Sequence, residues 1–136
     1  MTQQILDRAI GMVSQQMATP HRVLVCGDRN WIEELPIRRE LSKFSHGTVI
    51  IHGGASGADT IAGKVGRSLG FNVIVFPAQW GKYGRAAGPI RNTQMLDEGN
   101  PTIVLAFHPN ISLSKGTKNM VSQARSRGIK TIVFSN

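Results

Sequence analysis

Five short apolar runs, separated by segments of helical spacing, constrain the fold of this chain more than any other feature. The runs span residues 22–26, 49–52, 72–76, 102–107 and 131–134. The first of them, residues 22–26, lacks the strict alternation of apolar and polar residues, as expected of a strand that is buried on both faces. With helices between them, such runs predict an α/β fold: a Rossmann-like, doubly wound, mainly parallel five-stranded sheet with helices on both faces.

The segments between the runs have the apolar spacing of helices. They span residues 31–44, 57–69, 90–96 and 117–127. In the first of them, Trp31, Leu35 and Leu41 are expected on one side, facing the core. This helix begins either at Trp31 or near Pro36, because proline is tolerated in the first turn of a helix. Gly70 and Gly128 follow two of the segments and are expected to cap their C-terminal ends.

The first residues predict a further helix, which is amphipathic. Its apolar residues recur at spacings of three and four: Ile5, Leu6, Ala9, Ile10, Val13 and Met17. We therefore divide the chain into this N-terminal helix, residues 1–20, and one Rossmann-like domain, residues 21–136. The apolar face of the helix is expected to pack on the sheet or on another subunit, which makes a homo-oligomer the expected state.

Composition limits the class of protein. Of the 136 residues, 40% are hydrophobic and 18% are charged, which is typical of a globular domain. No apolar run approaches the roughly 18 residues of a membrane span, and the first twenty residues are too polar for a secretory signal. Cys26 is the single cysteine and cannot form an internal disulfide, so the cytoplasm is the expected compartment.

The charge balance favours anionic partners. The formal net charge is +8, from 16 Lys and Arg against 8 Asp and Glu. No acid occurs between Thr60 and Leu96 or after Glu98. A basic field of this kind attracts polyanions in general, so DNA, RNA and phosphorylated small molecules all remain open as partners.

A glycine-dense turn, residues 53–59, connects the second apolar run to the helix that follows. In α/β proteins a strand, such a turn and a helix start form a phosphate cradle, in which amide groups point outward and the helix dipole favours an anion. The spacing does not fit the dinucleotide motif G-x-G-x-x-G. It also misses the P-loop, because five residues separate Gly57 from Gly63 and Val65 stands where Ser or Thr belongs.

Several side chains near the carboxyl ends of the runs carry candidate roles. Arg91 is the best candidate for a phosphate clamp, since a guanidinium can bind two oxygens at once. Asp59 either complements the helix dipole or contacts a ribose hydroxyl or a base. Trp80 and Tyr83 either stack on a base or close the core. The histidines show no metal-ligand spacing, so neither a metal nor a cofactor is expected.

Four segments together carry a family resemblance: Gly53–Asp59, Pro77–Trp80, Ala87–Met95 and Lys115–Met120, with the start Val25–Trp31 fitting too. They resemble the YspA-type (YpsA-related) branch of the SLOG superfamily, the Rossmann-like group named for the Smf/DprA and LOG proteins. The resemblance implies that the two glycine turns hold a nucleotide or a nucleotide-derived molecule, including ADP-ribose-like signals. The ligand-binding residues expected on this basis are Gly27, Arg29, Gly53, Gly54, Ala55, Ser56, Gly57, Asp59, Trp80, Arg91, Asn92, Lys115, Gly116, Thr117 and Asn119.

The resemblance leaves three functions open. LOG enzymes release a base from a nucleoside monophosphate and carry an arginine and a P-G-G-x-G-T-x-x-E motif. Arg91 resembles that arginine and Gly116–Thr117 the G-T pair, but Met120 holds the place of the glutamate. The leading hypothesis is therefore a binding protein: a sensor, carrier or sequestering protein for a nucleotide or ADP-ribose-derived ligand. The others are an N-glycosidase or phosphoribohydrolase with Asp59 as the catalytic carboxylate, and a single-stranded DNA binder like the DprA relatives.

Overall fold

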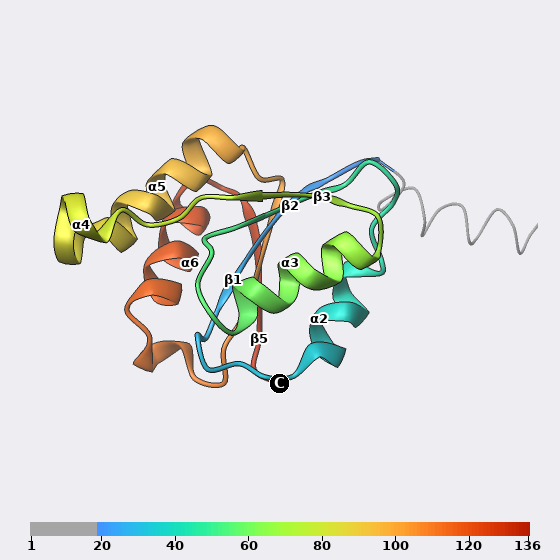
Figure 1. The fold of residues 1–136 in the computed structure, drawn as a ribbon, viewed down its shortest axis with the longest axis horizontal. Helices are drawn as coiled ribbons and strands as arrows, with labels where there is room; N and C mark the ends of the chain where they lie inside the picture. The colour runs from blue at the N-terminus through green and yellow to red at the C-terminus, as the bar shows by residue number, and fades with distance from the viewer. Residues whose placement is uncertain (1–18) are drawn as a thin grey trace, which may run out of the picture.

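The computed structural model describes residues 19–136, and its centre is one parallel sheet (Figure 1). The strands are β1 (Arg22–Gly27), β2 (Val49–His52), β3 (Asn72–Val75), β4 (Ile103–Phe107) and β5 (Lys130–Phe134), in the order β3-β2-β1-β4-β5. The predicted Rossmann-like arrangement of a five-stranded sheet and helices is confirmed. The helix predicted within residues 1–20 lies outside the described residues, apart from its last two positions.

β1 occupies the middle of the sheet, between β2 and β4. Its Val23 pairs with Ile50 of β2 and with Ile103 of β4. Because successive side chains of a strand point to opposite faces, Val23 belongs to the core on one face and Leu24 to the core on the other. Burial of both faces explains why this run is apolar throughout.

Two helices cover each face of the sheet. On one face, α2 (Glu34–Leu41) and α3 (Ala58–Ser68) contribute Ile37, Leu41, Ala62 and Val65 to the core. On the other face, α5 (Ala87–Gly99) and α6 (Gly116–Ser126) contribute Met95, Leu96, Met120 and Val121. Figure 1 shows the two pairs on opposite sides of the strands. None of the helices between residues 19 and 136 combines the length and apolar character that a membrane crossing requires.

Of the two starts expected for α2, the structure agrees with the one near Pro36. The helix begins at Glu34, because the residues before it turn back: the amide of Trp31 donates to the carbonyl of Asp28 at 3.1 Å. Starting from Glu34, the helical period places Ile37 and Leu41 on the core side. The expectation that Leu35 faces the core is wrong, since 64% of it is exposed.

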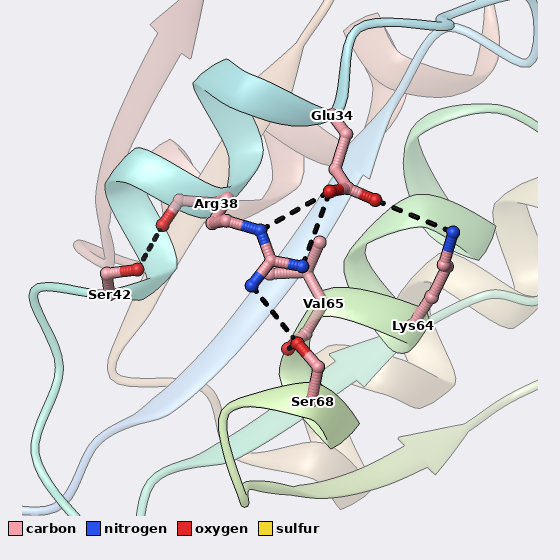
Figure 2. A network of polar contacts seen from close by, with 6 residues as sticks. All are labelled: Glu34, Arg38, Ser42, Lys64, Val65 and Ser68. Carbon is pink, nitrogen blue, oxygen red and sulfur yellow. Dashed lines mark hydrogen bonds and ion pairs between the residues drawn. The ribbon is translucent and has the colours of Figure 1, made fainter.

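Polar contacts join α2 to α3 at the surface (Figure 2). The Arg38 guanidinium lies 3.3 Å from the Glu34 carboxylate and donates to the Ser68 hydroxyl at 3.2 Å. Lys64 of α3 lies 3.6 Å from the same carboxylate. Because these side chains are one-third exposed or more, each ion pair contributes less than about 1 kcal/mol. The buried apolar contacts therefore hold the two helices together.

Candidate functional site

The candidate site is a cavity of about 540 Å³ at the carboxyl edge of the sheet. Here β1 and β4 end side by side, with Gly27 paired to Phe107. The chain leaves β1 toward β2 on one side and returns as β4 on the other, so the two following loops diverge and leave a crevice. A Cβ at position 27 would overlap the Phe107 carbonyl, so glycine permits the close approach of the two strand ends.

The cavity brings together most of the predicted ligand-binding residues. Those that line it are Gly27, Arg29, Ala55, Asp59, Trp80, Arg91, Asn92, Lys115, Gly116 and Thr117. Gly53, Gly54, Ser56, Gly57 and Asn119 were also predicted, and they do not line it. The binding role of all of these residues stays a prediction.

Other lining residues were absent from the prediction: Cys26, Asp28, Asn30, Gly88, Met95, His108, Leu113, Ser114 and Met120. Cys26, Asp28 and His108 lie at or just beyond the ends of two apolar runs, so their position relative to the strands is a signal that could have identified them. Met95 and Met120 have the spacing of ordinary core residues, and nothing in the sequence marks them as lining a cavity.

The glycine turn is closed by hydrogen bonds within the protein. The amides of Gly53 and Ala55 donate to Asp59 Oδ2 at 3.0 and 3.2 Å. The amide of Gly54 donates to His52 Nδ1 at 3.0 Å. The expectation that the amides of the turn point outward is therefore wrong for these three residues, because two neighbouring side chains already bind them.

Asp59 is almost fully buried, with 6% of its surface exposed. Burial raises the pKa of its carboxyl group to about 6, although the hydrogen bonds from Ala55 and Gly53 and the charge of Arg91 act in the opposite direction. Asp59 Oδ1 has no hydrogen-bond partner among residues 19–136. It is nevertheless not fully buried, because the one fully buried side-chain nitrogen or oxygen atom without a partner in those residues is His52 Nε2. Asp59 Oδ1 therefore keeps solvent access, and Asp59 lines the cavity.

His52 also stabilises the glycine turn, because its Nδ1 accepts the hydrogen bond from the amide of Gly54. Burial lowers the pKa of its imidazole to about 4, and the positive charges of Arg67 and Arg91 lower it further. The ring is therefore neutral at physiological pH, and because Nδ1 accepts a hydrogen bond, we assign the proton to Nε2. Gly63 of α3 makes room for the ring, since a Cβ there would lie 2.7 Å from Nε2.

Arg91 and Asn92 connect the glycine turn to the start of α6, and we call this pair the Arg91–Asn92 link. Arg91 Nη1 donates to the Gly53 carbonyl at 2.6 Å, and Arg91 Nε donates to Asn92 Oδ1 at 3.1 Å. Asn92 Nδ2 in turn donates to the Gly116 carbonyl and to Asn119 Oδ1, at 3.2 and 3.1 Å. Two of the guanidinium nitrogens of Arg91, which was predicted to clamp a phosphate, are thus used inside the protein.

The remaining walls of the cavity are part basic and part apolar. Arg29 and Lys115 bring positive charge, whereas Met95 and Met120 provide apolar surface. The Cys26 thiol also lines the cavity, but burial and the nearby Asp59 raise its pKa, so it is a poor nucleophile. Among residues 19–136, no group of three or more His, Cys, Asp and Glu side chains is placed to hold a metal ion.

Trp80 lies at the mouth of the cavity. It begins α4 (Trp80–Tyr83), which a short 3₁₀ helix, η1 (Gly84–Ala86), connects to α5. Figure 1 shows α4 at the periphery of the molecule, beyond α5. The indole approaches Gly88, where a Cβ would lie 3.5 Å from its nearest ring atom. Because 59% of Trp80 is exposed, the alternative that it closes the core is wrong.

The sheet order and the crevice define a Rossmann-like protein, and comparisons with known proteins agree. A model of the YspA, cpYpsA-related SLOG family matches residues 21–83. The Gene 61 protein of Mycobacterium phage D29 is 36% identical over 124 residues, which cover 85% of this chain and 97% of that protein. The chain belongs to the YspA, cpYpsA-related SLOG family, as its resemblance predicts.

A solved structure shares the fold. The X-ray structure of DNA processing protein A (DprA) from Streptococcus pneumoniae matches 88% of this chain with a TM-score of 0.53 and 15% sequence identity. This chain spans 61% of the length of that DprA chain. At this identity the likeness concerns the fold alone.

Proposed function

We propose that this protein binds a nucleotide or an ADP-ribose-derived small molecule in the crevice and acts as a sensor, carrier or sequestering protein. The observation that carries the proposal is one cavity of about 540 Å³ that holds basic groups, a carboxylate and an apolar wall together. A cavity of this size fits a small ligand, for which typical sites measure about 300–1,000 Å³. Membership of the SLOG family supports a nucleotide-related role in general.

The start of α6 is the part of the cavity best suited to the phosphate. Lys115, Gly116 and Thr117 line the cavity where this helix begins, and no acidic residue lies in its first turn. The helix dipole and the lysine both favour an anion there. Arg29 adds a second positive charge. The anionic end of the ligand is therefore proposed to bind at α6 rather than at the glycine turn, whose first amides are already bonded.

A pair of matched lysine variants tests this proposal. Thermal unfolding is measured with AMP, ADP-ribose and NAD, because a ligand that binds only the native state raises its stability, by about 2.7 kcal/mol at one hundred times Kd. Lys115→Ala should weaken binding at least about tenfold, the loss of one charge-assisted contact. Lys118→Ala is the control: it removes the same charge from the same helix, but Lys118 does not line the cavity. Failure of all three nucleotides to stabilise the protein would overturn the proposal.

Trp80 offers a second readout for the same proposal. We propose that its indole, which is exposed and lines the cavity, stacks on a base. The other tryptophan, Trp31, is buried against Phe107. In a Trp31→Phe variant, quenching of the remaining fluorescence on addition of AMP would report a base at Trp80. Quenching by AMP but not by ribose 5-phosphate is the expected result.

A hydrolytic function is the second candidate, and Asp59 favours it. A carboxyl group whose pKa is about 6 and whose Oδ1 keeps solvent access is suited to general acid catalysis near neutral pH. The proposed reaction is release of the base from a nucleotide by an N-glycosidase or phosphoribohydrolase. Chromatography of the products tests it, and an Asp59→Asn variant as active as the parent would remove Asp59 from the mechanism.

We further propose a cytoplasmic homo-oligomer in which residues 1–20 act apart from the domain of residues 21–136. The free thiol of buried Cys26 supports a reducing compartment. The apolar face predicted for residues 5–17 supports the oligomer. Light scattering should give fewer subunits per assembly for a chain starting at Thr19 than for the full chain. An equal number of subunits per assembly would contradict the role of the N-terminal segment.

A further inference from the structure

We infer that Asp59 selects the ligand: the cavity takes a molecule that presents a hydroxyl donor, such as a ribose diol, to Asp59 Oδ1 and its anionic group to the start of α6. This inference rests on the proposed binding function and names the chemistry of its ligand. It assigns Asp59 a specificity-determining role rather than a purely structural one.

The position of the carboxylate is fixed by its other oxygen. Asp59 Oδ2 accepts hydrogen bonds from the amides of Gly53 and Ala55 at 3.0 and 3.2 Å, so the plane of the group is held by the glycine turn. Oδ1 has no partner among residues 19–136, yet it is the oxygen that keeps solvent access. Asp59 is otherwise nearly buried and lines the cavity, so this access opens into the cavity.

An oxygen held in this way accepts a donor and rejects an anion. At about pH 8 the carboxylate is ionised, because its pKa is about 6, and an ionised carboxylate can only accept hydrogen bonds. A second phosphate at this point would meet its negative charge. The positive groups that line the cavity are Arg29, Arg91 and Lys115. The ligand is therefore expected to have one anionic end and one hydroxyl-bearing end.

Replacement by asparagine should weaken the preference. Gly53 and Ala55 still need an acceptor, so the amide oxygen of Asp59→Asn would turn toward them and leave the NH₂ group facing the cavity. The cavity would then present a donor where the parent protein presents an acceptor. A ribose hydroxyl could still accept a hydrogen bond from this NH₂ group, but it would lose the stronger bond to the ionised carboxylate, so its affinity should fall, and a phosphate at the same position should gain affinity.

The experiment is calorimetric titration at about pH 8 with three probes: AMP, its 2′,3′-dideoxy analogue, and adenosine 3′,5′-bisphosphate. The parent should bind AMP at least about tenfold more tightly than the other two, because each leaves a buried polar group unpaired or repelled. Asp59→Asn should show a smaller preference for AMP over the dideoxy analogue, because only a neutral hydrogen bond to the hydroxyl remains, and should bind the bisphosphate more tightly than the parent does.

Asp97→Asn is the matched control. It makes the same chemical change at an exposed residue of α5 that pairs with Arg127 at 2.5 Å and does not line the cavity. It should keep the order of affinities of the parent. Circular dichroism checks that each variant folds, and if Asp59→Asn does not, the three probes on the parent alone decide the question.

The two proposals fail in different ways. Equal affinity of the parent for AMP and for its dideoxy analogue would overturn the selective role of Asp59 and leave nucleotide binding intact. Absence of binding by AMP, ADP-ribose and NAD would overturn the binding function, and the role of Asp59 with it.

Discussion

Gly57 is the residue at which the glycine turn meets the loop after β1. Its backbone, at φ 75° and ψ −126°, has a conformation that side chains with a Cβ avoid. A Cβ there would also overlap the Asp28 carbonyl and the backbone of Arg29. The next amide, of Ala58, donates to the same Asp28 carbonyl at 3.1 Å. The close contact of these two loops therefore depends on glycine.

Gly57→Ala should lower the free energy of unfolding by about 2–4 kcal/mol, since it adds steric overlap to backbone strain. Gly70→Ala is the control, because Gly70 also has a positive φ, 84°, but no atom lies within 4 Å of where its Cβ would be. Gly70→Ala should lower the free energy of unfolding by about 1 kcal/mol, because it adds backbone strain without steric overlap. Urea denaturation measures both, and equal losses would contradict the role given to the loop contact.

Asp59 and His52 give stability opposite dependences on pH. The pKa of Asp59 is raised from 3.8 to about 6, so the folded state holds this proton more tightly and its contribution to stability falls as pH rises through that range. The pKa of His52 is lowered from 6.5 to about 4, so the unfolded state binds its proton more tightly and stability rises as pH rises through that range. In the parent the two contributions largely cancel.

In Asp59→Asn the pH dependence of stability that His52 contributes should become visible. Relative to the parent, the free energy of unfolding of the variant should increase by up to about 3 kcal/mol between pH 4 and pH 7, because the penalty for ionising buried Asp59 is gone. Denaturant titrations of both proteins at several pH values measure this difference. A difference that does not vary with pH would show that Asp59 titrates in the folded protein as it does in the unfolded chain.

Among the helices, α5 and α6 are joined by buried polar contacts, whereas α2 and α3 are joined by exposed ones. Asn92 of α5 is 4% exposed and bonds to Gly116 and Asn119 of α6. Gln123 of α6 donates to the same oxygen of Asn119 at 2.8 Å. Arg38 of α2 makes its contacts with α3 at the surface. Removing a hydrogen bond between α5 and α6 is therefore expected to cost more stability than removing one between α2 and α3.

Asn92→Ala should lower the free energy of unfolding by about 2–3 kcal/mol, because it leaves buried groups without partners. Arg38→Ala should cost less than about 1 kcal/mol, as an exposed ion pair does. Chemical denaturation compares the two variants. A larger loss for Arg38→Ala than for Asn92→Ala would contradict this ranking.

The strands could be predicted from sequence to within about two residues at their ends because each run is rich in apolar and β-branched residues, and β1 and β4, which are buried on both faces, are apolar along most of their length. A start of α2 near Pro36 could also be predicted, because proline is tolerated in the first turn of a helix, but the exposure of Leu35 could not, since Trp31, with which it shares helical spacing, belongs to the turn before the helix. At the site, the family resemblance predicted Arg29 and Lys115, and both line the cavity. The inward amides of the glycine turn could not be predicted, because the spacing of glycines is the same whether their amides face a ligand or the side chain of Asp59.

At the scale of the whole molecule, the net charge of +8 predicts some attraction to nucleic acid. Affinity for single-stranded DNA should fall steeply with salt, with a logarithmic slope of about −0.7 per phosphate contacted. Such attraction does not distinguish two lysines of one helix, so Lys115→Ala and Lys118→Ala should weaken DNA binding alike. Fluorescence anisotropy with an oligonucleotide at several salt concentrations checks this. A flat salt dependence would remove the electrostatic explanation.

The central place of β1 has a consequence for the order in which the protein is made. The first half of the chain, which contains β1, α2, β2, α3 and β3, is synthesised before β4. The hydrogen bonds between His52, Asp59 and the glycine turn can therefore form before β4 exists. The other edge of β1 stays unpaired until β4 is synthesised, roughly 1.5 to 6 s after β3 at typical elongation rates. Arg91 and Lys115 also arrive in this second half of the chain. The two walls of the crevice therefore form one after the other, and the crevice is complete only after α6 has docked and the Arg91–Asn92 link has formed.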